Sequence, residues 1–425
     1  MKYTKQIECT GSYDVIVAGG GASGIAAAVS AAELGARVLI IEKSGTLGGG
    51  LTLGHVGPTM GKYGENTFAH RINRLLGCVD RKVQDFELAK IRLTQLVYES
   101  GVDVYLNTSL IDVIKENDKL THAVIAAQSG PACVEGKIFV DATADGVLSY
   151  MSGEEYEMGR DDGLVQPVSV MFIIDGVDPE QKIMCRHEKM DTPLKKGNYL
   201  ELCKRACESG ELPPEINIVR LYPTHSDTER MVNATQICGT DPLDPLANFK
   251  AQYELRMQMD KVVDFLKNNV EGFENIRIKS SSDIIGVRES RRVVGEYTLT
   301  AEDLIEGRRF DDVIVHKACF PLDIHNPNGA GQAESSDCPV EAREYDIPYR
   351  ALLPKKTENL YTCGRCISGT HRAHASYRVM NTVMNIGEAV GIGAALCVDG
   401  KVSPRELEVR KIQEVLASRK INLFD

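Results

Sequence analysis

The stretch VIVAGGGASGIAAA, residues 15–28, decides the fold because it joins a strand to a helix through a glycine-rich turn. Residues 13–18 are a short β-branched apolar run, which is typical of a strand buried on both faces. Residues 22–34 are rich in alanine and predict a helix that Gly35 ends. Strand, turn and helix in this order predict a Rossmann-like α/β fold.

The turn itself predicts a binding site for a dinucleotide. Gly19, Gly21 and Gly24 match the pattern G-x-G-x-x-G. The first glycine allows the tight turn, the second lets a pyrophosphate approach the backbone, and the third lets the helix pack on the strand. The helix start at Ala22 and Ser23 offers free N–H groups and a partial positive charge to the phosphates. We therefore expect all five residues to bind the cofactor.

A second strand and a second glycine cluster follow. Residues 37–42 predict a strand that ends at Glu42, whose carboxylate is spaced to bind the ribose hydroxyls and to repel a 2′-phosphate. The turn alone does not separate FAD from NAD, because both present an AMP half to it. The cluster in residues 43–52 favours FAD, because its N–H groups can line the rest of a longer cofactor. The residues assigned to the cofactor here are Lys43, Gly48, Gly49 and Thr52.

Residues 137–146 read as a third cofactor segment. Residues 137–141 predict a strand, and a turn of small residues beginning at Ala142 leads to a helix near Gly146. Asp145 is placed either to hydrogen-bond a ribityl or ribose hydroxyl or to cap that helix. Ala142 and Asp145 are both assigned to the cofactor.

A fourth segment lies near the C-terminus. Residues 360–363 predict a strand, and a helix is predicted from Met380. The N-terminus of such a helix would bring positive potential to N1 and O2 of a flavin ring. Gly387 and Gly391, one turn apart, predict close packing of this helix on the first one. The residues assigned to the cofactor are Gly364, Arg365, Met380 and Asn381.

These segments, with residues 286–300 and 345–354, resemble the FAD-dependent oxidoreductases that have a glutathione-reductase-type flavin domain and are distantly similar to the fumarate reductase and succinate dehydrogenase flavoproteins. The resemblance spans nearly the whole chain. It implies noncovalent FAD, a Rossmann-like FAD-binding domain with a mixed parallel sheet and a β-meander, and an inserted α+β substrate domain. The implied boundaries are 1–153 and 345–425 for the FAD-binding domain and 154–344 for the insertion. The resemblance does not supply a substrate.

The remaining segments fit this organisation. Residues 102–140 alternate short apolar runs with polar turns, which suits the family's meander, where Leu110 matches the adenine contact. No second G-x-G-x-x-G follows a strand, so we expect no separate NAD(P)H domain. Further expected elements are a strand at 167–178, paired strands near 217–237, and helices at 198–210, 245–269 and 403–419, the last two capped by Asp244 and Ser403.

Composition restricts the class of partner. The formal net charge is -11 and no basic tract stands out, which argues against nucleic acid and favours a small molecule or a protein. Twelve cysteines without a secretory leader indicate reduced thiols in a cytoplasm. No apolar run approaches the ~20 residues of a membrane-spanning helix, so we expect no membrane partner. A homo-oligomer or an electron-transfer partner stays open.

Cys363, Cys366, His371 and His374 have spacings that resemble a zinc site or a redox dithiol. The overlap with the flavin segment argues against both, because Cys363 would end a buried strand and Gly364 would face the cofactor. We therefore interpret the thiols as small apolar packing residues and predict no metal site.

Five residues are candidates for substrate binding and catalysis. His371, Arg372, His374 and Arg378 lie where the resemblance places residues over the flavin to hold a substrate carboxylate. A guanidinium grips a carboxylate in a fork, and a histidine exchanges a proton near neutral pH. The resemblance adds Arg291, or its neighbour Arg292, as an anion-binding residue. The alternative is that some of these side chains bind flavin carbonyls or lie at the surface.

His55 lies near the position at which the respiratory relatives carry a histidine linked covalently to FAD. The surrounding residues depart from that pattern. We therefore expect His55 in the polar wall of the flavin pocket rather than a covalent bond.

Together these observations predict an FAD-dependent oxidoreductase that transfers a hydride between the flavin and a small organic substrate. Two alternatives stay open, an NAD-binding non-redox or thiazole-synthase-like enzyme and an electron-transfer flavoprotein subunit of a complex.

Overall fold

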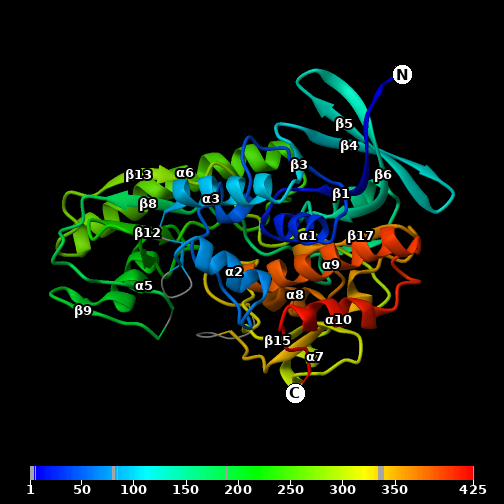
Figure 1. Ribbon diagram of the computed structural model, residues 1–425. Coiled ribbons are helices and arrows are strands. Elements are labelled where there is room, and N and C mark those ends of the chain that lie inside the picture. The colour runs from blue at the N-terminus through cyan, green and yellow to red at the C-terminus, as the bar shows by residue number, and fades with distance from the viewer. Residues whose placement is uncertain are drawn as a thin grey trace.

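The computed structural model describes residues 4, 6–78, 82–83, 85–187, 189–333 and 339–424. Its largest sheet carries the glycine-rich turn (Figure 1). The strands lie in the order β3-β2-β1-β6-β5-β4, and β17 pairs with the end of β6. Their bounds are β1 Cys9–Ala18, β2 Val38–Ile41, β3 Asp103–Tyr105, β4 Ser109–Glu116, β5 Lys119–Ala127, β6 Gly130–Asp141 and β17 Leu360–Thr362.

Strand β6 joins the two parts of this sheet. Its first half pairs antiparallel with β5, and its second half lies parallel to both β1 and β17. Strands β1, β2, β6 and β17 therefore end at one edge, as the ends of parallel strands do, and the cofactor segments follow from that edge. The predicted mixed sheet with its β-meander is confirmed. Strand β1 begins at Cys9, before the predicted start at Tyr13, because Cys9 and Ser12 also pair with β6.

Helices α1 (Ala22–Ala32) and α9 (Met380–Gly400) lie side by side in the core (Figure 1). A Cβ at Gly387 would stand 2.3 Å from the carbonyl oxygen of Ser23, and one at Gly391 would stand 2.1 Å from that of Ala27. The two backbones therefore approach more closely than any side chain would allow, as the sequence predicted. Helix α9 is long and apolar enough to cross a membrane, but 78% of its most apolar stretch is buried inside the protein.

The other helices of this part are α2 Phe68–Leu75, α3 Phe86–Glu99, α4 Val147–Met151, α7 Ala301–Glu306, α8 His371–Tyr377 and α10 Val409–Ser418. Two differ from the prediction. Residues 371–377, which precede the predicted helix start at Met380, form a helix of their own, α8, because the Thr370 side chain caps them by accepting from Ala373 N. The terminal helix begins at Val409 rather than after Ser403, because Ser403 binds Glu406 in a local turn.

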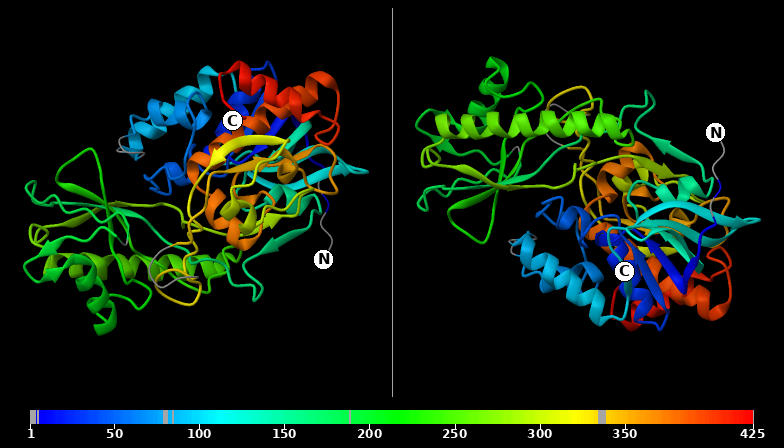
Figure 2. Two further views of the ribbon diagram at one scale, coloured as in Figure 1. Left: turned by 90° about the horizontal axis from the view of Figure 1, so that it is seen from below. Right: turned by 90° about the horizontal axis from the view of Figure 1, so that it is seen from above.

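A second sheet, in the order β11-β12-β8-β13, forms the part that projects to one side of the first sheet (Figure 2). The predicted paired strands and both helices are present, and Asp244 caps α6 by accepting from Leu246 N and Ala247 N. An apolar core of its own lies between sheet and helices. The bounds are β8 Phe172–Asp175, β11 Arg220–Pro223, β12 Glu229–Asn233, β13 Arg277–Ser281, α5 Tyr199–Ser209 and α6 Pro245–Asn269.

Within the described residues, three two-stranded sheets accompany these two: β7 (Tyr156–Met158) with β14 (Arg291–Val293), β9 (Pro193–Leu194) with β10 (Gly197–Asn198), and β15 (Val313–Ala318) with β16 (Tyr345–Pro348). Strand β15 lies within the predicted insertion 154–344, and β16 lies just outside it. Buried residues from Leu299 to Leu322 pack in the same core as α1 and α9. The domain boundaries stay a prediction.

Candidate active site

The first glycine loop, residues 19–24, leaves open space beside the start of α1. Gly19 has φ +105°, and a Cβ there would stand 2.4 Å from Ala142 O. A Cβ at Gly24 would stand 1.9 Å from Gly19 O. At Gly21, by contrast, no heavy atom of the described residues lies within 4 Å of the Cβ position. Gly19 and Gly24 are therefore required for packing, whereas the free side of Gly21, next to the N–H groups of Ala22 and Ser23, is the space a diphosphate would take.

The second glycine loop, residues 48–54, lies against the first. Gly48 N donates to Gly20 O at 2.8 Å, and a Cβ at Gly49 would stand 3.3 Å from Gly21 Cα. Thr52 is buried, and its hydroxyl donates to Leu47 O within the loop. Around Gly50 the described residues again leave the Cβ position open. The two loops therefore present their backbones to one shared space, while the side chain of Lys43 is exposed.

Glu42 stands where β2 ends, beside the first glycine loop. Its Oε2 accepts from Gly20 N and its Oε1 accepts from Ser44 N, both at 2.7 Å. Each carboxylate oxygen keeps a second lone-pair direction, so the group can also accept from a ribose hydroxyl. Leu110 lies on β4 and is partly buried against an apolar cluster that the meander shares with β1 and β2.

Asp145 pairs with Arg365 rather than capping a helix. Its Oδ1 accepts from Ser290 Oγ at 2.7 Å and from Arg365 Nη2. Burial alone would raise the pKa of Asp145, but Arg365 and the Ser290 hydrogen bond outweigh it and lower the pKa. The capping alternative is wrong, because α4 begins after Gly146 at φ +63° and Asp141 accepts from Ser149 N instead.

The C-terminal segment brings Gly364 against α1. Gly364 has φ +83°, and a Cβ there would stand 2.6 Å from Ser23 Oγ. The thiols on either side point to different carbonyls, Cys363 to Ser23 O and Cys366 to Asp141 O. Burial raises the pKa of Cys363 to about 12 and that of Cys366 well above its ordinary value, so both are held as uncharged thiols. This arrangement favours the packing interpretation over a zinc site or a redox dithiol.

A cavity of about 850 Å³ lies between these loops and the second sheet. Gly50, Gly54 and Gly61 line one side, and the start of α9 enters it through Val379 and Met380. Asn381 does not face it freely, because its side chain donates to Thr59 O and Gly61 O and accepts from Asn73. Asn381 therefore positions residues 59–61 beneath the cavity.

The cavity wall carries an excess of positive charge. Among the described residues that line it, five arginines and two lysines stand against two carboxylates. They are Arg186, Arg220, Arg288, Arg365, Arg378, Lys82 and Lys189, with Asp323 and Glu341.

The centre of this wall is formed by His325, which is buried, and by Arg378, Arg288 and Asp323, which are partly buried. Arg378 Nη2 donates to Asp323 O at 3.0 Å and to Gln166 Oε1 at 3.3 Å, and its Nε has no partner among the described residues. Burial lowers the pKa of Arg288 to about 9, and the like charge of Arg378 adds to the effect. Burial lowers the pKa of His325 to about 4, with Arg288 the next cause, so this ring is neutral at pH 7.

Asp323 is the counter-charge at this centre. Its Oδ2 lies 3.5 Å from His325 Nε2 and 3.7 Å from Arg378 Nη2. Burial would raise the pKa of Asp323, but His325 and Arg378 outweigh it, so the carboxylate stays charged. Like charges partly withdrawn from water are costly when the nearby carboxylates are fewer than the cations.

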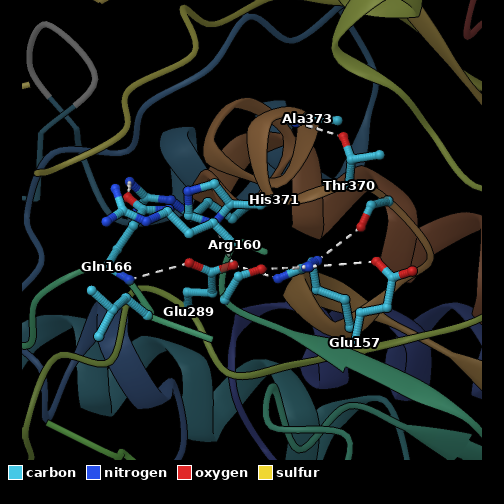
Figure 3. A network of polar contacts seen from close by, with 12 residues as sticks. Glu157, Arg160, Gln166, Glu289, Thr370, His371 and Ala373 are labelled. Carbon is cyan, nitrogen blue, oxygen red and sulfur yellow. Dashed lines mark hydrogen bonds and ion pairs between the residues drawn. The ribbon is translucent and has the colours of Figure 1, made fainter. Parts of the chain in front are cut away.

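Two other candidates, His371 and Arg292, contact the buried Glu289. Figure 3 shows His371 and Glu289 in this network, which shares Gln166 with Arg378. Glu289 Oε1 accepts from Arg292 Nη1 and lies 2.8 Å from His371 Nδ1, while Glu289 Oε2 accepts from Gln166 N. Arg292 also donates to Gly159 O and Gly369 O. The Arg292 guanidinium is therefore hydrogen-bonded to groups of the protein itself. The network joins α8 to the segment that leads into the second sheet.

The remaining candidates lie apart from the cavity lining. Arg372 is on the outer side of α8, its side chain 40% exposed and ion-paired with Glu302. Arg291 lies over the ring of Tyr150, 4.2 Å from its centroid. His374 is buried, and burial together with Arg292 holds its pKa well below the ordinary range. Among the predicted substrate residues, the structure thus places Arg378 in the cavity and Arg372 at the surface.

His55 turns away from the cavity that its neighbours Gly54 and Val56 line. It has φ +50°, and its ring stacks on Phe86 with centroids 4.7 Å apart. Burial lowers the pKa of His55. This packing on α3 differs from the predicted place in the flavin wall.

Sequence reasoning did not single out Arg186, Arg220, Asp323 or His325. They come from three separated segments that meet only in the folded chain. The signal that could have found part of the group is the polar pair Asp323 and His325, which stands between apolar residues in the short run PLDIHN.

Residues 14–416 match the family of FAD dependent oxidoreductases. Two curated relatives match over shorter segments: thiamine thiazole synthase from Aeropyrum pernix is 36% identical over 124 residues, which are 26% of this chain and 43% of that protein. Digeranylgeranylglycerophospholipid reductase from Thermoplasma volcanium is 28% identical over 176 residues, 36% of this chain and 42% of that protein. The matched segments therefore span less than half of either relative.

Solved structures share the fold at low identity. A geranylgeranyl bacteriochlorophyll reductase-like protein from Thermoplasma acidophilum has a TM-score of 0.52 and 14% identity, over 97% of this chain and 84% of its own. The aromatic hydroxylase CabE has a TM-score of 0.51 and 11% identity, over 96% of this chain and 66% of its own.

Proposed function

Because the chain belongs to the family of FAD dependent oxidoreductases, we propose that it transfers a hydride between the flavin of FAD and a small organic anion held in the cavity. FAD is its cofactor and it is an enzyme. The hydride transfer itself and the anion as substrate class are the parts that we propose.

The residues present fit FAD. Open space beside Gly21 and Gly50 lies where two glycine loops expose their backbones, and Glu42 stands at the ribose position. At the other end, Arg365 Nε has no partner among the described residues, and Met380 begins a helix whose positive end enters the cavity. When bound, the flavin supplies the acceptor or donor of the hydride. The chain contributes placement, charge and exclusion of water.

The observation that carries the substrate proposal is the buried positive charge around Arg378 and Arg288. The like charge of Arg378 adds to the burial that lowers the pKa of Arg288. The carboxylate of Asp323 opposes this effect at both guanidinium groups, and Glu289 is a second opposing charge at Arg378. A carboxylate or phosphate in the cavity would restore the balance and accept hydrogen bonds from both. A neutral alcohol or sugar would leave the excess charge uncompensated, so an anion is the class that the wall fits.

His325 supports the proton part of a hydride transfer. Its ring is neutral at pH 7, and Nδ1 lies 3.2 Å from Gln236 Oε1 while Nε2 faces Asp323. The neutral ring has one nitrogen without a proton, which can take the proton of a substrate hydroxyl as the hydride leaves carbon. The adjacent Asp323 carboxylate favours the charged ring, whereas burial and Arg288 oppose it.

The test is anaerobic bleaching of the bound flavin by matched sets of organic carboxylates, organic phosphates, neutral alcohols and sugars. We expect only anions to reduce the flavin. In Arg378→Gln, the concentration giving half the maximal rate should rise about 10- to 100-fold, because a hydrogen bond to a charged group contributes roughly 1.5–3 kcal/mol. Arg372→Gln is the matched control, since it removes the same charge outside the cavity and should behave as wild type.

Two results would contradict this proposal. Bleaching by neutral compounds at equal rates would exclude an anion as the substrate class. Equal behaviour of Arg378→Gln and Arg372→Gln would show that the cavity arginines do not hold the substrate. A purified protein that carries NAD and no flavin would instead favour the thiazole-synthase-like alternative.

A further inference from the structure

The opposite end of the first sheet carries a second group of chemically active side chains. Cys9 on β1, His122 on β5 and Cys133 on β6 place one ligand atom each within 4.8 Å of one another. Cys133 is buried, His122 is partly buried and Cys9 is exposed. Strand β1, which begins at Cys9, runs beside β6 (Figure 1).

The pairing of the strands, and not only the side-chain rotamers, brings these residues together. Cys9 is the partner of Cys133 in the parallel pair β1 and β6. His122 is the partner of Glu135 in the antiparallel pair β5 and β6. Paired residues share a face of a sheet, and so do Cys133 and Glu135, which are two residues apart on one strand. All four therefore belong to one face, which we call the three-strand face.

We propose that Cys9, His122 and Cys133 bind a thiophilic divalent cation, with Zn²⁺ the ion that the donor set fits. Two thiolates and an imidazole are common zinc ligands, and three of them leave one tetrahedral position open. Thr121 Oγ1 lies 3.0 Å from His122 Nδ1, which fixes the ring and leaves Nε2 for the ion. The exposed side at Cys9 admits water or the carboxylate of Glu135 as fourth ligand.

The binding step balances without an oxidant or reductant. Each thiol releases its proton to solvent as its sulfur bonds the ion, so two protons leave for each cation bound. The two thiolate charges neutralise the charge of the cation. The bound ion would cross-link three strands and fix the beginning of β1 to the meander.

This site is separate from the cavity. Cys9 begins β1, whereas the glycine loop follows its end at Ala18, roughly 25–30 Å away at the usual rise per strand residue. A variant that loses metal binding is therefore expected to keep the flavin chemistry, and a variant that loses the flavin is expected to keep metal binding.

The experiment adds Co²⁺ to the full-length, FAD-loaded protein after treatment with a chelator and a phosphine reductant. Tetrahedral Co²⁺ bound by thiolates absorbs at longer wavelengths than oxidised flavin, so the two signals separate. We expect one equivalent of Co²⁺ per chain, displaced by Zn²⁺. Cys9→Ser, an exposed position that the fold tolerates, should weaken binding on the order of 100-fold. His122→Gln should lower it in the same direction.

Cys207→Ser is the matched control, because Cys207 is partly buried on α5, far from His122 in the sheet, and its loss should leave Co²⁺ binding unchanged. The proposal is overturned if wild type gives no thiolate-bound Co²⁺ spectrum, or if Cys9→Ser binds as tightly as wild type. It is also overturned if mass spectrometry of the protein isolated under reducing conditions shows Cys9 and Cys133 joined as a disulfide that excludes the ion.

Discussion

This chain has two groups of cysteine and histidine residues, and for both the folded arrangement differs from what their spacing in the sequence predicts. Cys363, Cys366, His371 and His374 lie within twelve positions and have the spacing of a zinc site. The structure separates them, because two thiols donate to different carbonyls and His371 pairs with Glu289. Cys9, by contrast, lies more than a hundred residues from the two partners that the sheet brings to it.

The difference lies in what each backbone must do. Residues 363–374 leave a buried strand, pass around the cofactor space and enter α8. The backbone changes direction over short distances there, so the side chains point in different directions. On the three-strand face, the paired strands keep side chains of one face together, although the register of β1 on β6 shifts between Cys9 and Ser12. Close spacing in sequence predicts a site when the backbone between the ligands is regular, and strand pairing predicts one when they are far apart.

The largest expected effect is a loss of FAD affinity that leaves the three-strand face unchanged. Gly21→Leu should lower FAD affinity by more than about 100-fold, because the side chain would fill the pyrophosphate space while its Cβ meets no described atom. Co²⁺ binding at Cys9 and Cys133 should not change. Both are measured on one preparation, by flavin absorbance after gel filtration and by Co²⁺ titration. Gly64→Leu, at an exposed glycine outside the turn, is the control; retention of FAD in Gly21→Leu would break the assignment.

How much of this could be read from the sequence depends on whether the signal is local. The first strand, the glycine turn, α1 and the partner glycines Gly387 and Gly391 were predictable, because close backbone approach leaves a mark in residue size. The family and FAD followed from the same segments.

The cavity wall was not predictable in this way. Arg186, Arg220 and His325 reach one space from separate segments, and an arginine or histidine in a loop looks the same whether it faces solvent or a cavity. Arg372 and Arg378 illustrate the limit, since both lie in one short stretch and only the turn of α8 decides which one enters the cavity.

Acid should lower the free energy of unfolding, because His325 in the cavity wall is held neutral in the folded state. The pKa of His325 in the folded state is about 4 and its unfolded value is near 6.5, so the unfolded chain binds more protons between these values and stability falls as pH falls. Between pH 7 and pH 5 the expected loss from this residue is about 2 kcal/mol. Urea unfolding at both pH values should show a smaller loss in His325→Gln. An unchanged difference between the two pH values in that variant would contradict the buried neutral ring.

A smaller effect distinguishes the two kinds of thiol. Cys366→Ala should destabilise the fold by about 1–2 kcal/mol, because it removes a buried sulfur and its contact with Asp141 O, whereas Cys9→Ala should stay within about 0.5 kcal/mol. Denaturant midpoints measure both. In the folded, metal-free protein, a thiol reagent should modify Cys9 long before Cys363 or Cys366. Equal rates would mean that the C-terminal segment opens, and the contrast between the groups would fail.

The smallest expected effect concerns the ion pair of Arg372, which lies outside the cavity. Arg372 and Glu302 are ion-paired at 3.3 Å with both side chains well exposed, so a double-mutant cycle through Arg372→Ala and Glu302→Ala should give a coupling of about 0.2–1 kcal/mol. The coupling should shrink in high salt, because exposed charges are screened. Flavin reduction by an anionic substrate should keep its wild-type concentration dependence in Arg372→Ala. If that dependence weakened tenfold while the coupling stayed small, Arg372 would reach the substrate after a rotation of α8, and the boundary drawn between Arg372 and Arg378 would have to move.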